Sequence, residues 1–214
     1  MGELVSLADH RREHEREARD DGARATLVVA FDLASPFTYL TAERADRLPD
    51  DLDWRPVLIP GMGWSADRHA RRVAEARAAA LRLPLVWPEL HASRGRGAMR
   101  AAAYAAEEER GGAFVLAAAR LAFCGGFDLD DPDVLIEAAA AANLRLDGCL
   151  AAVSDPGRDV AMLETGRRLV GQGLDRLPGM VVGRRTFSGE DRLVEAVAAA
   201  RADAWDLRRR ALGR

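Results

Sequence analysis

Lysine is absent from this sequence. All 31 basic residues are arginines, and together with 34 acidic residues they give a formal net charge of −3. A weakly acidic chain lacks the positive field that draws proteins to nucleic acid. We therefore expect no nucleic-acid partner.

Long apolar runs are absent as well. No stretch approaches the roughly 20 residues that a membrane-spanning helix requires. The chain begins with a short apolar segment and then becomes highly charged over residues 9–21, which is the reverse of the order in a secretory signal. We expect a cytoplasmic protein without a membrane partner.

Cysteine is scarce. Cys124 and Cys149 belong to no Cys-x-x-Cys pair and to no metal-ligand spacing, and His69 and His91 lack a spaced partner. In a reducing compartment we expect both cysteines to be free thiols that serve as small apolar side chains. No metal site is predicted.

The apolar patterns predict a β-α-β opening and a β-β-α ending. A continuous apolar segment at residues 26–31 is typical of a strand buried on both faces. Ser35 followed by Pro36 favours a helix start, because serine caps helices and proline is tolerated at the first helical position. We predict further elements as helix 35–48, strand 54–59, helix 66–81, connector 83–88, four or five helices within 97–170, hairpin strands 179–182 and 185–187, and helix 190–202.

This order predicts an α/β protein with a thioredoxin-like fold, in which an all-helical domain is inserted into a central mixed sheet. Residues 25–64 and 172–204 would form the thioredoxin-like domain, and residues 65–171 the helical insertion. Residues 1–24 form a charged N-terminal extension and residues 205–214 a C-terminal tail.

Four segments carry a resemblance to a known family. Residues 31–40 (FDLASPFTYL) resemble the signature of the DsbA-related 2-hydroxychromene-2-carboxylate isomerases and kappa-class glutathione transferases. The segments PLVWP at 84–88, Leu177-Pro178 after Gly173, and GEDRL at 189–193 follow in the family's order. The resemblance runs from about residue 27 to the end of the last helix, and it implies the fold given above.

The resemblance also implies a chemistry. Disulfide oxidoreductases of this superfamily carry a cysteine pair where Ser35 and Thr38 stand, so no dithiol cycle can run here. In the isomerase and transferase branch, the equivalent of Ser35 stabilises the thiolate of bound glutathione, which makes Ser35 the predicted catalytic residue. The alternative for Ser35 is an ordinary helix N-cap.

Further site residues follow from the same comparison. Leu177 and Pro178, the latter at the position of the family's cis-proline, and Glu190 with Asp191 would bind the thiol cofactor. Asp191 could equally be an ordinary acid at a helix start. Phe37, Thr38 and Trp87 would line the substrate site, although Thr38 can be read as a helix residue and Trp87 as core.

Two departures separate this chain from the family's pattern. The family places Asn and Lys after the second strand to hold the carboxylates of the cofactor, whereas residues 61–68 contain neither, and Arg68, Arg71 or Arg72 would have to substitute. The segment before the proline carries Asp175 and Arg176, which leaves open glutathione or another low-molecular-weight thiol.

The sequence thus predicts a glutathione- or thiol-dependent isomerase of the 2-hydroxychromene-2-carboxylate type, or a kappa-type transferase, acting on a small aromatic or unsaturated substrate. The alternative is a non-catalytic thioredoxin-like binding protein. A homodimer is a further hypothesis, with the N-terminal extension or the tail around Trp205 as its interface.

Overall fold

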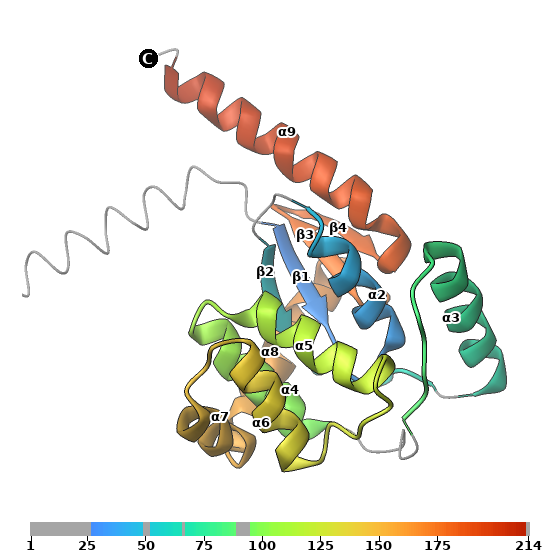
Figure 1. The fold of residues 1–214 in the computed structure, drawn as a ribbon. Coiled ribbons are helices and arrows are strands. Elements are labelled where there is room, and N and C mark those ends of the chain that lie inside the picture. Colours follow the sequence, from blue (N-terminus) through green and yellow to red (C-terminus); the bar gives the residue numbers. More distant parts are fainter. Residues whose placement is uncertain (1–26, 49–51, 66, 89–94, 213–214) are drawn as a thin grey trace, which may run out of the picture.

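The computed structural model describes residues 27–48, 52–65, 67–88 and 95–212 of the chain, and Figure 1 shows their arrangement. Their strands form one mixed sheet in the order β2–β1–β3–β4. The central strand β1 (Leu27–Phe31) is parallel to β2 (Leu52–Pro56) and antiparallel to β3 (Gly179–Val182), and β4 (Arg185–Ser188) completes a hairpin with β3. The predicted fold class and the predicted hairpin are therefore confirmed.

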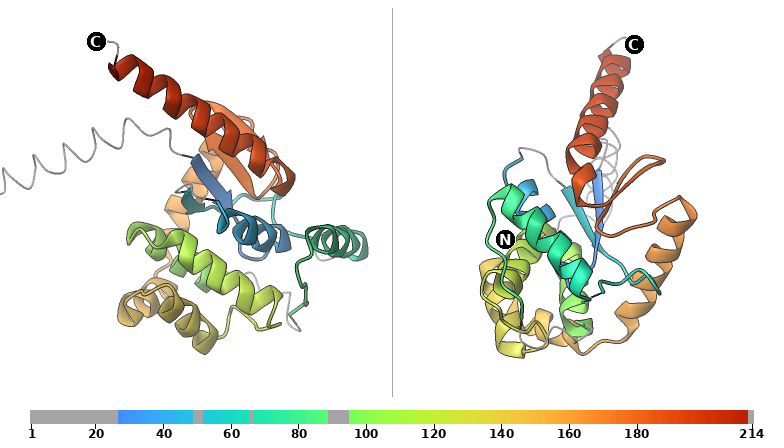
Figure 2. Two further views of the ribbon diagram at one scale, coloured as in Figure 1. Left: turned by 45° about the horizontal axis from the view of Figure 1, so that its top comes forward. Right: turned by 90° about the vertical axis from the view of Figure 1, so that its right-hand side faces the viewer.

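Helices lie on both faces of this sheet, because its strands are apolar on both sides. Leu27, Val29 and Phe31 of β1 belong to the main hydrophobic core, whereas Ala30 belongs to a second, smaller core cluster on the opposite face. Helix α2 (Pro36–Ala45) and helix α9 (Leu193–Leu212) lie on the first face, and α8 (Gly157–Gly171) supplies Leu169 to the second (Figure 2).

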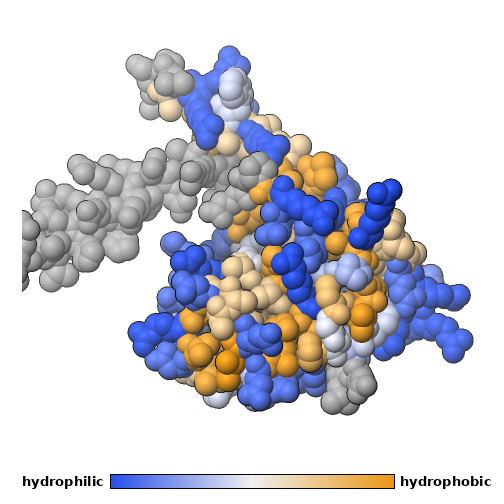
Figure 3. Space-filling model, in the orientation of Figure 1, coloured by the Kyte–Doolittle hydropathy of each residue, from blue (hydrophilic) through white to orange (hydrophobic). Residues whose placement is uncertain are grey.

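The helices between β2 and β3 begin with α3 and continue to α8. Their bounds are α3 (Arg68–Leu81), α4 (Arg96–Glu107), α5 (Gly111–Phe123), α6 (Pro132–Ala141), α7 (Leu146–Val153) and α8. Helices α4 to α8 are the five segments that the prediction allowed. Figure 1 shows α3 standing apart from the others, and Figure 3 shows hydrophilic side chains projecting from that side of the molecule.

One hydrophobic core runs through the sheet and the helices inserted into the chain. Phe31 and Met180 from the strands share a cluster with Met99 of α4, Phe114 of α5 and Leu135 of α6. Trp54 of β2 packs against α5. The predicted boundaries between the two domains stay predictions, but the packing is continuous across them.

The first helix ends at Ala45 rather than near residue 48, and two other predicted elements differ more from the structure. The second strand was expected at 54–59 but is β2 (Leu52–Pro56), because the N–H of Leu58 donates to the carbonyl of Met162 in α8 (3.3 Å) and so leaves the sheet. The last helix was expected to end near Ala202 but reaches Leu212, since the sequence offers no Gly or Pro before Gly213. Residues 205–212 of the predicted tail are therefore helical.

The approach of the chain after β2 to α8 depends on a glycine. A Cβ atom on Gly166 would lie 2.6 Å from the carbonyl oxygen of Leu58 and 2.8 Å from Cγ1 of Ile59, which is closer than such contacts allow. Gly171, in the last turn of the same helix, has no heavy atom within 4 Å of its hypothetical Cβ.

These two glycines make a matched pair for mutation. We expect Gly166→Ala to lower the free energy of unfolding by about 1–3 kcal/mol, because the backbone must shift to admit the methyl group. Gly171→Ala should leave it unchanged or raise it by up to about 1 kcal/mol through helix propensity. Urea unfolding of both variants is the measurement, and equal effects would contradict the close approach.

Candidate active site

The site predicted around Ser35 lies where β1 ends and α2 begins. The carbonyl oxygen of Asp32 accepts a hydrogen bond from the N–H of Ser35 (3.1 Å) and another from the hydroxyl of Thr38 (2.7 Å). These two bonds fold the chain sharply from the strand into the helix. Thr38 is fully buried, and its hydroxyl is used in holding this turn, so the structure shows Thr38 as a support of the turn.

Ser35 is the N-cap of α2 and is buried. Its Oγ accepts a hydrogen bond from the N–H of Phe37 (3.3 Å). A serine hydroxyl has two acceptor sites and one donor, so capping the helix leaves its O–H available to donate. The N-cap and the thiolate-stabilising role, which the sequence presented as alternatives, are therefore compatible in one side chain.

The segment before β3 lies beside this turn. Ala30 pairs with Gly179 across the sheet, so the register continues to the point where Leu177 and Pro178 face the end of β1. The Leu177–Pro178 bond is cis. Within the described chain the backbone N–H and C=O of Leu177 form no hydrogen bond, whereas the carbonyl of Pro178 accepts one from the N–H of Gly189 (2.8 Å).

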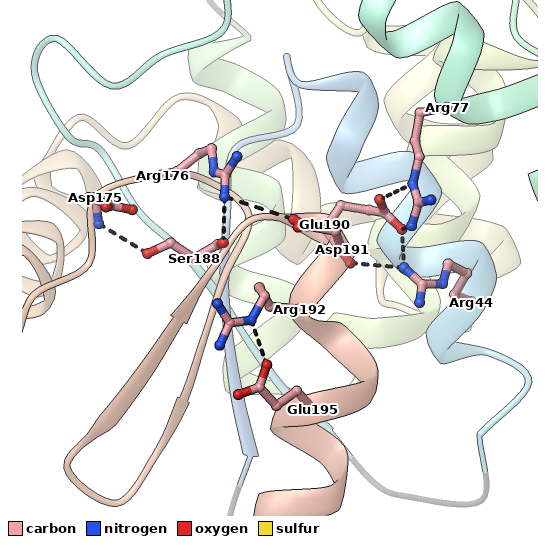
Figure 4. A network of polar contacts seen from close by, with 9 residues as sticks. All are labelled: Arg44, Arg77, Asp175, Arg176, Ser188, Glu190, Asp191, Arg192 and Glu195. Atoms are coloured by element: carbon pink, nitrogen blue, oxygen red, sulfur yellow. Dashed lines mark hydrogen bonds and ion pairs between the residues drawn. The ribbon is translucent and has the colours of Figure 1, made fainter. Parts of the chain in front are cut away.

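Glu190, predicted to bind the cofactor, is held inside the protein. It is buried at 4% exposure, and its carboxylate contacts Arg44 of α2 and Arg77 of α3. The Nε of Arg77 donates to Oε2 at 2.7 Å, and a guanidinium nitrogen of Arg44 donates to both the carboxylate and the backbone carbonyl of Glu190 (Figure 4). Both carboxylate oxygens are thus occupied, which makes Glu190 an anchor for the site.

Asp191 follows Glu190 in the short helix η1 (Glu190–Arg192) and is exposed. Its Oδ1 lies 3.8 Å from Arg176, and this contact is its only ion pair within the described residues. Arg176 also donates to the carbonyl of Ser188 (3.0 Å), as Figure 4 shows. The charged segment before the proline therefore lies against Asp191.

Gly189 makes this arrangement possible. Its φ is +97°, and a Cβ there would lie 2.7 Å from Oδ1 of Asp191 and 2.8 Å from Cζ of Arg176. The N–H of Asp175 donates to Oγ of Ser188 (3.2 Å), which ties the same loop to the end of β4.

Aromatic side chains from three segments meet beside the first turn of α2. The ring of Phe37 is 5.6 Å from Trp64, and Trp64 is stacked on Trp87 at 6.2 Å. Sequence analysis singled out Phe37 and Trp87 but missed Trp64, which connects them. The buried Nε1 of Trp64 has no hydrogen-bond acceptor within the described residues.

Of the three arginines considered as substitutes for lysine, one reaches this cluster. The guanidinium of Arg71 lies 4.9 Å from the centre of the Trp87 ring, a cation–π contact. Trp87 also donates to Glu75 of α3 (2.8 Å). Arg68 and Arg72 are exposed on α3.

Asp32 is a second residue that sequence reasoning did not assign to the site. Its Oδ1 accepts from the N–H of Ala34 (2.9 Å). Burial raises the pKa of this carboxyl above 3.8, against the opposing effects of the Ala34 hydrogen bond and of the positive charge on Arg96. The acid after the first strand is visible in the sequence, but its burial depends on the tertiary structure.

No three His, Cys, Asp or Glu side chains of the described residues converge as metal ligands would. None of the described helices combines the length and the apolar character needed to span a membrane. Cys124 and Cys149 are free, and the thiol of Cys124 donates to the hydroxyl of Tyr39 (3.1 Å).

A mixed sheet of this order, with a cis-proline facing the start of the first helix, defines a thioredoxin-like protein. The family model described as a DSBA-like thioredoxin domain matches residues 26–200. The chain belongs to this family. No curated protein matches it.

Solved structures agree on the fold. A 2-hydroxychromene-2-carboxylate isomerase is similar with a TM-score of 0.65 and 20% identity, over 81% of this chain and 93% of that chain. A probable DsbA oxidoreductase from Streptomyces coelicolor has a TM-score of 0.61 and 20% identity, over 85% and 90%. The structure of the cytosolic disulfide reductase DsbM from Pseudomonas aeruginosa with GSH has a TM-score of 0.59 and 20% identity, over 86% of this chain and 99% of that chain.

The raised pKa of Asp32 has a consequence for stability. Between pH 3.8 and the higher native pKa, the folded state binds more protons than the unfolded state, so the free energy of unfolding falls as the pH rises. Asp32→Asn removes this dependence. The stability of the variant relative to the parent should therefore be greater near pH 7 than near about pH 3.5.

Urea unfolding at both pH values is the measurement for Asp32→Asn. Asp130→Asn, at an exposed loop position, is the matched control for the change of a carboxylate to an amide. A constant difference for Asp32→Asn would contradict the burial of its charge.

Proposed function

We propose that this protein is a thiol-dependent isomerase or transferase of the 2-hydroxychromene-2-carboxylate isomerase type, which acts on a small aromatic or unsaturated substrate with glutathione or another low-molecular-weight thiol. The observation that carries the proposal is Ser35: its hydroxyl caps α2 as an acceptor and keeps its O–H free at the end of β1. Similarity to an isomerase in fold supports it.

The residues present suit a thiol ligand. An anionic sulfur would accept the O–H of Ser35 at the start of α2, where the helix dipole also favours negative charge. The unpaired N–H and C=O of Leu177 would pair with the backbone of a peptide-like thiol, as a short strand would. Asp191 would accept hydrogen bonds from an ammonium group of the ligand.

When bound, the thiol supplies a nucleophilic sulfur that can add reversibly to a conjugated double bond, or to an electrophile in the transferase reaction. Asp32 lies in the same turn as Ser35, and burial raises the pKa of its carboxyl, so it would be able to exchange a proton during this chemistry. The aromatic cluster of Phe37, Trp64 and Trp87 would supply an apolar wall for a planar substrate.

A binding protein without catalysis is the second candidate. Arg176 counts against the thiol-dependent enzyme. Its guanidinium lies against Asp191 and competes for the carboxylate that would hold the ammonium group of the thiol cofactor. A screen of electrophiles and chromene-type acids with the thiol present separates the two candidates, since a binding protein would turn over none of them.

Calorimetric titration with reduced glutathione tests the proposal. We expect saturable binding, with the bound thiol ionised at lower pH than the free thiol, as followed by the ultraviolet absorbance of the thiolate. Ser35→Ala should raise the pKa of the bound thiol and abolish turnover. Ser35→Thr, which keeps both the cap and the donor, and Ser154→Ala, at an exposed position far along the chain, are the controls. Absence of binding at millimolar thiol would defeat the thiol-dependent function.

Substitutions of Asp191 and Arg176 should change the affinity for glutathione in opposite directions. Asp191→Asn should weaken glutathione binding about tenfold, because a hydrogen bond between two charged groups becomes one with a neutral amide. Arg176→Ala should tighten binding a few-fold by releasing Asp191 from an exposed ion pair, which is worth about 0–1 kcal/mol.

The same calorimetric titration measures both variants, and Arg184→Ala, at the exposed hairpin turn, is the control. Weaker binding in Arg176→Ala would show that the arginine holds the ligand and would contradict the competition.

A further inference from the structure

The turn that joins β1 to α2, residues 32–35, is bonded to a distant part of the chain through Leu33. The turn is closed by the hydrogen bond from the N–H of Ser35 to the carbonyl of Asp32 (3.1 Å), which leaves the N–H groups of its two central residues without a partner of this kind. The N–H of Ala34 donates to Oδ1 of Asp32 (2.9 Å). The N–H of Leu33 donates to Sδ of Met99 in α4 (3.3 Å). Met99 is therefore the acceptor for the main-chain donor that the turn itself does not satisfy.

This hydrogen bond lies inside the protein. Leu33 and Met99 are each 1% exposed, and both belong to the main hydrophobic core. A main-chain donor that is buried among apolar side chains costs stability when it has no acceptor. The thioether of methionine can accept a hydrogen bond, and it carries no hydrogen that would need an acceptor in turn. Met99 thus supplies the acceptor without adding an unsatisfied donor to the core.

Helix α4 is itself firmly held, so Met99 is a fixed point for the turn. The guanidinium of Arg100, the next residue along α4, donates through two of its nitrogens to Asp159 of α8 (2.8 and 3.0 Å). A further bond joins Arg100 to the carbonyl of Val153 at the end of α7 (3.1 Å). The turn that contains Ser35 is therefore tied to three of the inserted helices through one sulfur atom.

Arg96 lies on the same side of α4 as Met99, because the two residues are three positions apart in the helix. Burial raises the pKa of Asp32, and the positive charge of Arg96 opposes that rise. The side of α4 that carries these two residues therefore acts on the turn through both a hydrogen bond and a charge.

We propose that Met99 is a positioning residue of the site: by accepting the N–H of Leu33, its sulfur holds residues 32–35 in the orientation that presents the O–H of Ser35 to the bound thiol. The role toward the thiol rests on the proposed function, whereas the hold on the turn does not. If Met99 only filled the core, leucine would replace it with little consequence, because the two side chains are similar in volume and both apolar. If the sulfur is needed as the acceptor, leucine leaves the N–H of Leu33 unpaired, and the turn loosens.

Hydrogen exchange of backbone amides, measured by NMR on isotope-labelled protein, tests the hold on the turn. In Met99→Leu we expect the amides of residues 33–35 to exchange at least about tenfold faster than in the parent. Met162→Leu is the matched control and should leave these rates unchanged. Met162 is 3% exposed in the same core, and its sulfur forms no hydrogen bond within the described residues. Leucine keeps the backbone carbonyl that accepts from Leu58.

Three results of the exchange measurement would overturn the proposal. Unchanged rates at residues 33–35 in Met99→Leu would show that the sulfur does not hold the turn. An equal acceleration of the amides of β3 would show a loss of global stability in place of a local release. The same acceleration in Met162→Leu would show that any loss of a buried methionine has this effect.

The pKa of the thiol of bound glutathione, followed by the ultraviolet absorbance of the thiolate, tests the role toward the ligand. We expect Met99→Leu to raise this pKa toward that of the free thiol and Met162→Leu to leave it unchanged. In a Ser35→Ala background, Met99→Leu should add no further rise, because the turn no longer carries the donor that it would orient. An equal rise in both backgrounds would overturn the proposal. Failure of the parent to bind glutathione would defeat the proposed function instead, and the exchange rates would still decide whether Met99 holds the turn.

Discussion

One buried carboxylate between two arginines determines how the parts of the site meet. Glu190 begins η1, Arg44 lies in the last turn of α2, and Arg77 lies in α3. The ion pairs hold three segments that are distant in sequence, and removal of either partner from such a buried pair leaves a charge without compensation. The positions of Asp191, one residue further on, and of α3 over the aromatic cluster both follow from this anchor.

The remainder of the site is assembled around backbone groups. The carbonyl of Asp32 fixes the turn into α2, and the register of β1 with β3 brings the cis-proline segment to the same edge. The hydroxyl of Ser35 therefore needs no hydrogen bond from another side chain to hold it in place. Ser35 is oriented by capping the helix that it begins, and its Oγ accepts the N–H of Phe37 while its O–H remains able to donate.

Local sequence patterns were sufficient for the fold and for part of the site. The apolar run of β1, the Ser-Pro start of α2 and the Gly183 turn are local signals, and the structure follows each of them. The end of β2 was not predictable, because it depends on Met162, more than 100 residues away. The same holds for the ion pair between Glu190 and Arg77, because the two residues are 113 positions apart in the sequence. Trp64 and Asp32 stand out because Nε1 of Trp64 is buried and because burial raises the pKa of Asp32. The spacing of residues in the sequence does not reveal this burial.

The continuous core has a consequence for how this family member can change over evolutionary time. Trp54 of β2 lies within 3.3 Å of the positions that Cβ atoms on Gly111 and Gly112 of α5 would occupy, so strand and inserted helices are fitted to each other. The helical segment is therefore not a detachable module that could be exchanged for that of a relative. Change in this part of the protein would have to arise by substitutions within the existing helices, each constrained by the strand beneath it.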